Sequence, residues 1–247
     1  MCGAQVSDGA HAGTGTIMAS VRAVMPNHPA CAEALAMAKS SLPASILYHS
    51  FRVYLFAQAF ARLFQDNGEP SPPPPSPLAP GGQPDSTASA AELPHALFVA
   101  CILHDVGTAA EHDAVPERFE IVGADVAARL LRAHDTPEPA VREAWLAISL
   151  HTSPGIAERL GGAVRALRLA VRADFGSYPA PPPESLPGGA NLIRWKLPRL
   201  EIEKDLGNAV VRQALADPQK APAASWPADL LRAKRADPGW EGVNGAF

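Results

Sequence analysis

The sequence contains few of the residues that build covalently braced or nucleic-acid-binding proteins. Its three cysteines, Cys2, Cys31 and Cys101, are scattered and form no CxxC pair. This spacing argues against a disulfide framework and against a zinc knuckle. Lys and Arg number 21 against 25 Asp and Glu, which gives a net charge of −4. Because no basic excess is available to neutralise a phosphate backbone, we expect no nucleic-acid polymer as a partner.

Long apolar runs and aromatic residues are also scarce. No segment approaches the roughly 18 apolar residues needed to span a bilayer, so we expect no membrane contact. The first residues lack the charged and then apolar segments of a secretory signal, which favours a cytoplasmic protein. Aromatic residues make up only 6% of a chain that is 47% hydrophobic. Since Ala and Leu dominate instead, we predict an all-α fold.

Apolar residues recur at steps of three and four along much of the chain, which predicts helices. The expected helices cover residues 29–42, 45–64, 94 to a stop at Gly107, 120–134, 138–151, 158–175, 199–216 and 226–236. Residues 67–91 are rich in Pro, Gly and Ser, and predict a flexible insertion. We therefore divide the chain into a loosely ordered start (1–28), a helical domain (29–217) and a C-terminal helix with its tail (218–247).

The dipeptide His-Asp occurs three times, and context singles out His104-Asp105. This pair ends an apolar helix, where buried polar groups without partners are costly, and a metal ion would satisfy both. Adjacent residues on a helix diverge by about 100°, so they share a ligand only near a helix end, which Gly107 predicts here. His49 and Asp174, on two other apolar helices, complete a nitrogen and oxygen set. Such a set suits Zn²⁺, Mn²⁺, Fe²⁺, Co²⁺ or Ni²⁺.

Each of these residues has a plainer interpretation when taken alone. His49 could be a hydrogen-bonded core histidine, and Asp174 a helix-end residue bonded to the backbone. The His104-Asp105 pair could be a simple ion pair or a turn feature. Their joint occurrence on successive apolar helices favours the metal interpretation.

The order His, His-Asp, Asp on a helical chain resembles the HD-domain superfamily of metal-dependent phosphohydrolases, over about residues 45–176. Residues 47–56 (LYHSFRVYLF) are similar to the first metal-ligand helix of the cyanamide hydratase branch. Residues 103–108 (LHDVGT) and 118–124 (RFEIVGA) are similar to the second ligand motif of that branch and to the segment after it. His151 stands where the family carries another histidine.

This resemblance implies an HD-type helical bundle, here with a Pro-rich insertion and a helical C-terminal extension. It implies one divalent metal, zinc before Fe, Mn, Co or Ni, held by His49, His104, Asp105 and Asp174. Glu120 replaces a histidine that many HD phosphohydrolases use in binuclear sites, which implies a mononuclear centre. The expected reaction is hydration of a small nitrile such as cyanamide, to urea, by a metal-activated hydroxide.

The resemblance also suggests roles for residues around the metal. The expected catalytic residues are Asp105 at the metal, and Glu120 and His151, either of which could protonate the nitrile nitrogen or orient a ligand imidazole. Thr108 is expected to bind substrate, although a threonine after a glycine stop is more often a cap. The aromatic residues expected to line the pocket are Phe51, Tyr54 and Phe119, although aromatic residues at helical spacing are usually core residues.

Two other functions stay open. Arg52 and Arg118 adjoin the expected site and could bind phosphate, which would suit an HD-type phosphohydrolase of a nucleotide monophosphate. A non-catalytic metal-binding or regulatory HD protein is the second alternative, with the Pro-rich segment as its interaction element. The expected partner is a small-molecule substrate, and the alanine-rich helical surface is compatible with a homo-oligomer.

Overall fold

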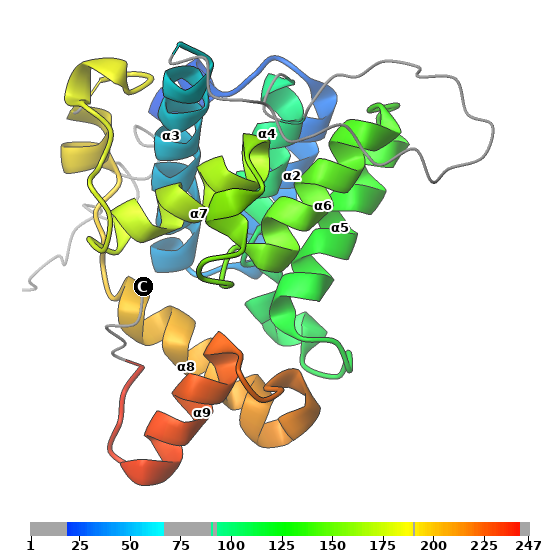
Figure 1. The fold of residues 1–247 in the computed structure, drawn as a ribbon, viewed down its shortest axis with the longest axis vertical. Helices are drawn as coiled ribbons and strands as arrows, with labels where there is room; N and C mark the ends of the chain where they lie inside the picture. The colour runs from blue at the N-terminus through cyan, green and yellow to red at the C-terminus, as the bar shows by residue number, and fades with distance from the viewer. Residues whose placement is uncertain (1–18, 67–89, 91–92, 190, 243–247) are drawn as a thin grey trace, which may run out of the picture.

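The computed structural model describes residues 19–66, 90, 93–189 and 191–242, and these residues contain helices and no strand (Figure 1). The predicted all-α class is therefore confirmed. The α-helices labelled in Figure 1 are α2 (Pro29–Ser41), α3 (Ala44–Asp66), α4 (Pro94–Leu103), α5 (Phe119–Ala133), α6 (Glu138–Leu150), α7 (Gly162–Asp174), α8 (Ile202–Ala216) and α9 (Trp226–Ala236). The predicted insertion at 67–91 lies outside the described residues except for Ala90.

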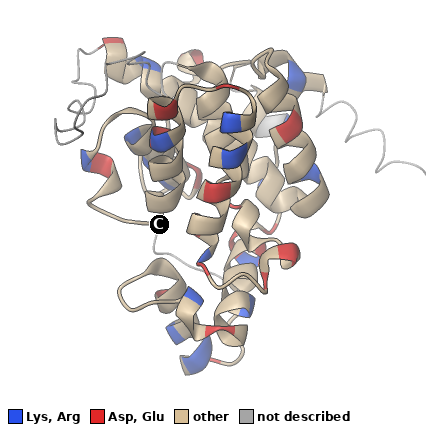
Figure 2. Ribbon diagram, turned by 90° about the vertical axis from the view of Figure 1, so that its right-hand side faces the viewer, with Lys and Arg blue, Asp and Glu red and all other residues tan. Residues whose placement is uncertain are grey.

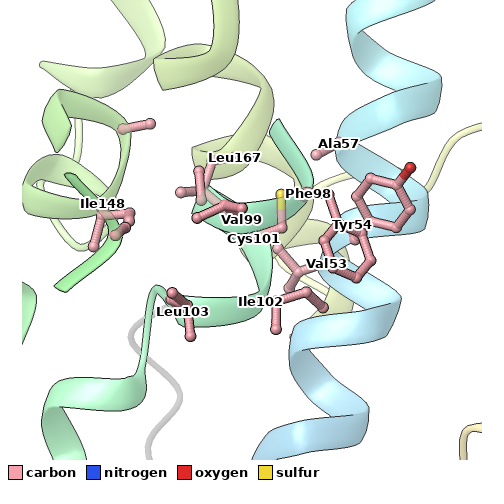
Figure 3. Close-up of a cluster of buried hydrophobic side chains, with 14 of the residues drawn as sticks. Val53, Tyr54, Ala57, Phe98, Val99, Cys101, Ile102, Leu103, Ile148 and Leu167 are labelled. Atoms are coloured by element: carbon pink, nitrogen blue, oxygen red, sulfur yellow. The ribbon is translucent and has the colours of Figure 1, made fainter. Parts of the chain in front are cut away.

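The centre of the bundle is the short helix α4, which is apolar on every side. All residues from Ala96 to Leu103 are buried, as expected for a helix surrounded by protein. Helices α2, α3, α5 and α6 pack around it. Figure 3 shows Val53 and Tyr54 of α3 against Phe98 of α4. The residues that follow its last turn, 104–109, are buried as well.

The two largest differences between predicted and observed helix boundaries are at the start of α7 and at the end of α4. Helix α7 begins at Gly162 and not near residue 158, because residues 157–159 form a separate 3₁₀ turn, η3 (Ala157–Arg159). Gly161 and Gly162 then adopt positive φ angles of 72° and 50°, which break the helical path. Helix α4 ends at Leu103, and Gly107 falls in the following 3₁₀ turn, η1 (Val106–Thr108). Gly107 is thus not the glycine stop that was predicted.

Helix α8, together with the C-terminal helix α9, forms a layer across one end of the bundle. Figure 1 shows α8 and α9 side by side below the helices α3 to α7. The hydroxyl of Ser45, in the first turn of α3, donates a hydrogen bond to Asp205 of α8. Ser225 caps α9 by accepting a hydrogen bond from the Ala228 N–H. The predicted helical extension is present, and its division from the domain at residue 217 stays a prediction.

The surface charge is mixed. Figure 2 shows basic and acidic positions interspersed along the ribbon, which agrees with the small net charge of −4. Among the described helices, none combines the length and the apolar character that crossing a bilayer requires.

Candidate metal centre

Three buried side chains converge where α3 passes the end of α4. The Nε2 atoms of His49 and His104 lie 3.3 Å apart. The Oδ2 atom of Asp105 is 3.2 Å from Nε2 of His104 and 3.7 Å from Nε2 of His49. One ligand atom from each residue therefore lies within 4.8 Å of the others, a group that could hold a metal ion.

The end of α4 explains how two adjacent residues reach the same point. His104, the residue directly after α4, still has helical backbone angles, φ −60° and ψ −31°. Asp105 then leaves the helix with φ −104° and ψ 4°. This change of direction turns the Asp105 side chain back toward the imidazole of His104, which a continuing helix would not allow.

Hydrogen bonds fix the orientation of three imidazole rings around this group. In His49, Nδ1 donates to the Asp174 carboxylate at 2.6 Å. In His104, Nδ1 donates to the Cys101 carbonyl at 2.7 Å. In His151, Nδ1 donates to the Ile148 carbonyl at 2.6 Å. A carbonyl or carboxylate only accepts, so Nδ1 carries the proton and Nε2 of the neutral ring carries a lone pair. Metal-binding histidines in proteins are usually held in this way.

The Asp105 carboxylate faces these lone pairs. Both of its oxygens are buried, and no described residue donates a hydrogen bond to either of them. A buried carboxylate without a donor is costly, and lone pairs 3.2–3.7 Å away add repulsion. A divalent cation would relieve both. The residues present therefore fit a metal ion on chemical grounds.

The pKa shifts of His104 and Asp105 indicate the same need for positive charge beside the carboxylate. Burial lowers the pKa of His104, yet the adjacent Asp105 carboxylate raises it above its usual value overall. Burial raises the pKa of Asp105, yet His104 and His151 in their protonated forms would hold it well below its usual range. For His49 burial dominates and lowers the pKa, which keeps its ring neutral and able to act as a ligand.

Asp174, expected to be a fourth ligand, lies on the Nδ1 side of the His49 ring, whereas His104 and Asp105 lie on its Nε2 side. Its Oδ2 accepts from Nδ1 of His49 at 2.6 Å and from Nη2 of Arg52 at 2.8 Å, and its Oδ1 accepts from Nε of Arg52 at 2.6 Å. Burial raises the pKa of Asp174, but His49 and Arg52 lower it well below its usual range. In this structure Asp174 orients the first histidine, and it is not among the three residues that converge.

His151 and Phe119 lie beside the group. Nε2 of His151 is 3.5 Å from Oδ1 of Asp105, and its ring stands perpendicular to that of His104 with centroids 5.0 Å apart. The Phe119 ring packs against His151 at 5.7 Å. The structure therefore brings the expected His151 to the site and places Phe119 one layer further out.

The remaining expected residues are engaged elsewhere. Glu120 is fully buried and accepts hydrogen bonds from Arg118 and from the Thr152 hydroxyl. The hydroxyl of Thr108 donates to the Asp105 carbonyl at 2.7 Å, so it closes the turn as a cap would. Tyr54 packs on Phe98 within the core.

Phe51 is likewise a core residue of α3. The part of Arg52 in orienting the site was not foreseen, although its position three residues after His49 places both on one face of α3. The contribution of α8, described below, has no comparable sequence signal.

The sequence was also compared with known proteins. The family model described as HD domain matches residues 46–186, more than half of the 247 residues. That span begins three residues before His49 and includes His104, Asp105 and Asp174. No curated protein matches the chain.

Proposed function

Because the chain belongs to the HD-domain family, which implies metal-dependent hydrolase-type chemistry, we propose that His49, His104 and Asp105 bind one divalent metal for the addition of water to a small uncharged substrate. Cyanamide is the substrate that we propose first, and zinc the metal. The bound metal would supply water activated for attack near neutral pH. The observation that carries the proposal is the Asp105 carboxylate, buried without a donor and facing two imidazole lone pairs.

His151 is the group that we propose for proton transfer. Water addition to a nitrile places negative charge on nitrogen, which an acid must protonate. Nδ1 of His151 is fixed on the Ile148 carbonyl, so Nε2 is the atom that can gain and release a proton. Glu120 is a weaker candidate because Arg118 and Thr152 already occupy its carboxylate.

The arginines around the site favour an uncharged substrate over a phosphate ester. Phosphate binding needs cationic groups that are free to face the substrate. Arg52 is paired with Asp174, and Arg118 with Glu120. Arg199 donates to the Asp174 carbonyl and to Glu203. Each of these three guanidinium groups near the site thus has an acceptor within the protein.

Burial of the site favours a small substrate. His49 and His104 are 0% exposed and Asp105 is 1% exposed. A molecule the size of a nucleotide could reach them only after a large rearrangement, whereas a nitrile of a few atoms needs little space. Size and charge therefore both support cyanamide over a nucleotide monophosphate.

The experiment is elemental analysis of the purified protein together with a urea-release assay on cyanamide. We expect about one zinc per chain in the wild type. His104→Ala should lose both the metal and urea release, because the variant removes a proposed ligand and the imidazole beside Asp105. The control is His112→Ala, which alters another His-Asp pair that lies outside the site.

The other outcomes separate the alternatives. Metal without urea release, but with phosphate release from nucleotide monophosphates, would replace the hydratase with a phosphohydrolase. Metal without any turnover would favour a regulatory protein. A wild-type chain that binds no divalent metal would refute the proposed function.

A further inference from the structure

Two consecutive residues of α8 hold the turn that follows Asp105. The side-chain Nε2 of Gln213 donates to the Gly107 carbonyl at 2.9 Å. The Nη2 of Arg212 donates to the Thr108 carbonyl at 3.1 Å. Neighbouring carbonyls of η1 are thus bound by neighbouring side chains from a helix about 100 residues further along the chain.

Asp113 joins the two donors into one network. Its carboxylate accepts from Nε of Arg212 at 3.1 Å, from Nη2 at 3.0 Å, and from Nε2 of Gln213 at 3.1 Å. Hydrogen bonds from Arg212 lower the pKa of Asp113, so the carboxylate stays ionised at neutral pH. Gln213 is itself buried, so its amide hydrogens are committed to this turn and to Asp113.

The opposite side of the turn is also closed. The N–H and the hydroxyl of Thr108 both donate to the Asp105 carbonyl, at 2.9 Å and 2.7 Å. A Cβ atom on Gly107 would lie 2.1 Å from the Phe119 carbonyl oxygen, so α5 presses directly on the turn. The segment that carries Asp105 is therefore held between α5 on one side and α8 on the other.

Other residues after 186 contact the remaining parts of the site. Nη1 of Arg52 donates to the Leu197 carbonyl at 3.2 Å and to the Pro198 carbonyl at 3.1 Å. Trp226, at the start of α9, packs on Phe119, whose ring contacts His151. Each segment that brings a residue to the proposed centre is thus tied, directly or through one side chain, to residues after 186.

We propose that Gln213 and Arg212 are positioning residues of the metal centre. They hold the Asp105 turn in place from a helix outside the HD-matched span of 46–186. The proposal rests on the metal site of the proposed function. Its physical basis is that a metal tolerates only small errors in ligand position, and a short 3₁₀ turn keeps its ligand within that tolerance only where neighbouring groups hold it.

The test is metal affinity in single variants of the full chain. We expect Gln213→Ala and Arg212→Ala to weaken Zn²⁺ or Co²⁺ binding by up to about 10–100-fold, the range for direct hydrogen-bond partners of metal ligands, because they act on Asp105 through its turn. Gln219→Ala and Arg232→Ala are the matched controls. Gln219 is exposed on the same extension, and Arg232 pairs with Asp229 on α9, away from the turn.

A second readout separates positioning from general destabilisation. At saturating Co²⁺ the visible absorption bands report the ligand geometry, which should change in Gln213→Ala and Arg212→Ala and not in the controls. The side chain of Arg212 is 48% exposed, so its variant should fold even if Gln213→Ala does not. Wild-type affinity and an unchanged cobalt spectrum in Arg212→Ala would overturn the proposal.

The same titration distinguishes the two proposals from each other. Weak binding by the wild-type chain itself would remove the metal centre and this inference together. Tight binding by the wild type and by both α8 variants would leave the proposed function intact and remove the positioning role alone.

Discussion

At the scale of single residues, Asp174 shows how one carboxylate can serve two buried groups. It accepts from the imidazole of His49 and, through two hydrogen bonds, from the guanidinium of Arg52. Both partners are almost completely buried. Removing the carboxylate charge would therefore leave a cation in the protein interior without its counter-charge.

We expect Asp174→Asn to lower the free energy of unfolding by about 3–5 kcal/mol, because Arg52 is left buried and unpaired. Urea denaturation of the metal-free protein measures this loss. The control is Asp229→Asn, which breaks the exposed pair with Arg232 and should cost less than about 1 kcal/mol. Equal losses in the two variants would contradict the prediction.

The pH dependence of the same variant has a definite sign. Because the pKa of Asp174 is lowered in the folded protein, its contribution is complete above the ordinary carboxyl value of about 3.9 and is lost as the pH falls below it. Asp174→Asn should remove that part of the acid sensitivity.

A site residue can be predicted from the sequence when its polarity is unusual for its position. His104 and Asp105 stand out because they are polar at the end of an apolar helix, and the structure places them together. Gln213 cannot be found in this way, because a glutamine on a helix is usually solvated. Its partners are the Gly107 carbonyl and the Asp113 carboxylate, about 100 residues away, and only the folded chain brings them together.

At the scale of elements, helix periodicity predicted most of the structure, and the junctions were less predictable. Helix α9 occupies 226–236 as expected, because its apolar face is clear in the sequence. The end of α4 was placed too late because Gly107 was interpreted as a conformational stop. In the structure this glycine is required by the proximity of Phe119, a contact between segments that local patterns do not contain.

This contact makes Gly107→Ala the sharpest test of the element packing. The added Cβ would meet the Phe119 carbonyl at 2.1 Å, so the turn or α5 must move. We expect a loss of at least about 1–3 kcal/mol in stability, as for other overpacked sites, and weaker metal binding because Asp105 shifts with the turn. Thermal unfolding and zinc titration measure the two effects.

A glycine elsewhere serves as the control. Gly239→Ala adds the same methyl group next to the Asp237 side chain at 3.2 Å, which can move aside. It should change neither stability nor metal affinity appreciably. Wild-type behaviour of Gly107→Ala would show that the turn is more tolerant than the close contact indicates.

At the scale of the whole molecule, a second histidine cluster joins three helices far from the metal centre. His28 at the start of α2 stacks on His95 of α4, with ring centroids 4.1 Å apart, and contacts His134 at the end of α5 edge-on. His134 is paired with Glu33, and Nε2 of His95 lies 3.1 Å from the Thr136 hydroxyl. Burial, followed by His28 and His134, lowers the pKa of His95.

The lowered pKa makes global stability depend on pH in a predictable direction. When the folded state binds a proton less readily than the unfolded state, stability falls as the pH drops below the unfolded value, about 6.5 for histidine. We expect the free energy of unfolding to decline below this pH, and to decline less steeply in His95→Gln. Denaturation curves between about pH 5 and 8 measure the difference.

The difference between wild type and His95→Gln separates the contribution of His95 from that of the histidines at the metal centre. Burial also lowers the pKa of His49, which contributes to the decline with the same sign, but that contribution is common to both proteins and cancels in their difference. His112→Gln, at a partly exposed histidine outside both clusters, should follow the wild-type curve. Parallel curves for wild type and His95→Gln would show that the cluster accepts a proton without cost. The stacked pair would then serve only to pack α2 against α4, and a decline between about pH 5 and 8 would come from other groups with a lowered pKa, such as His49.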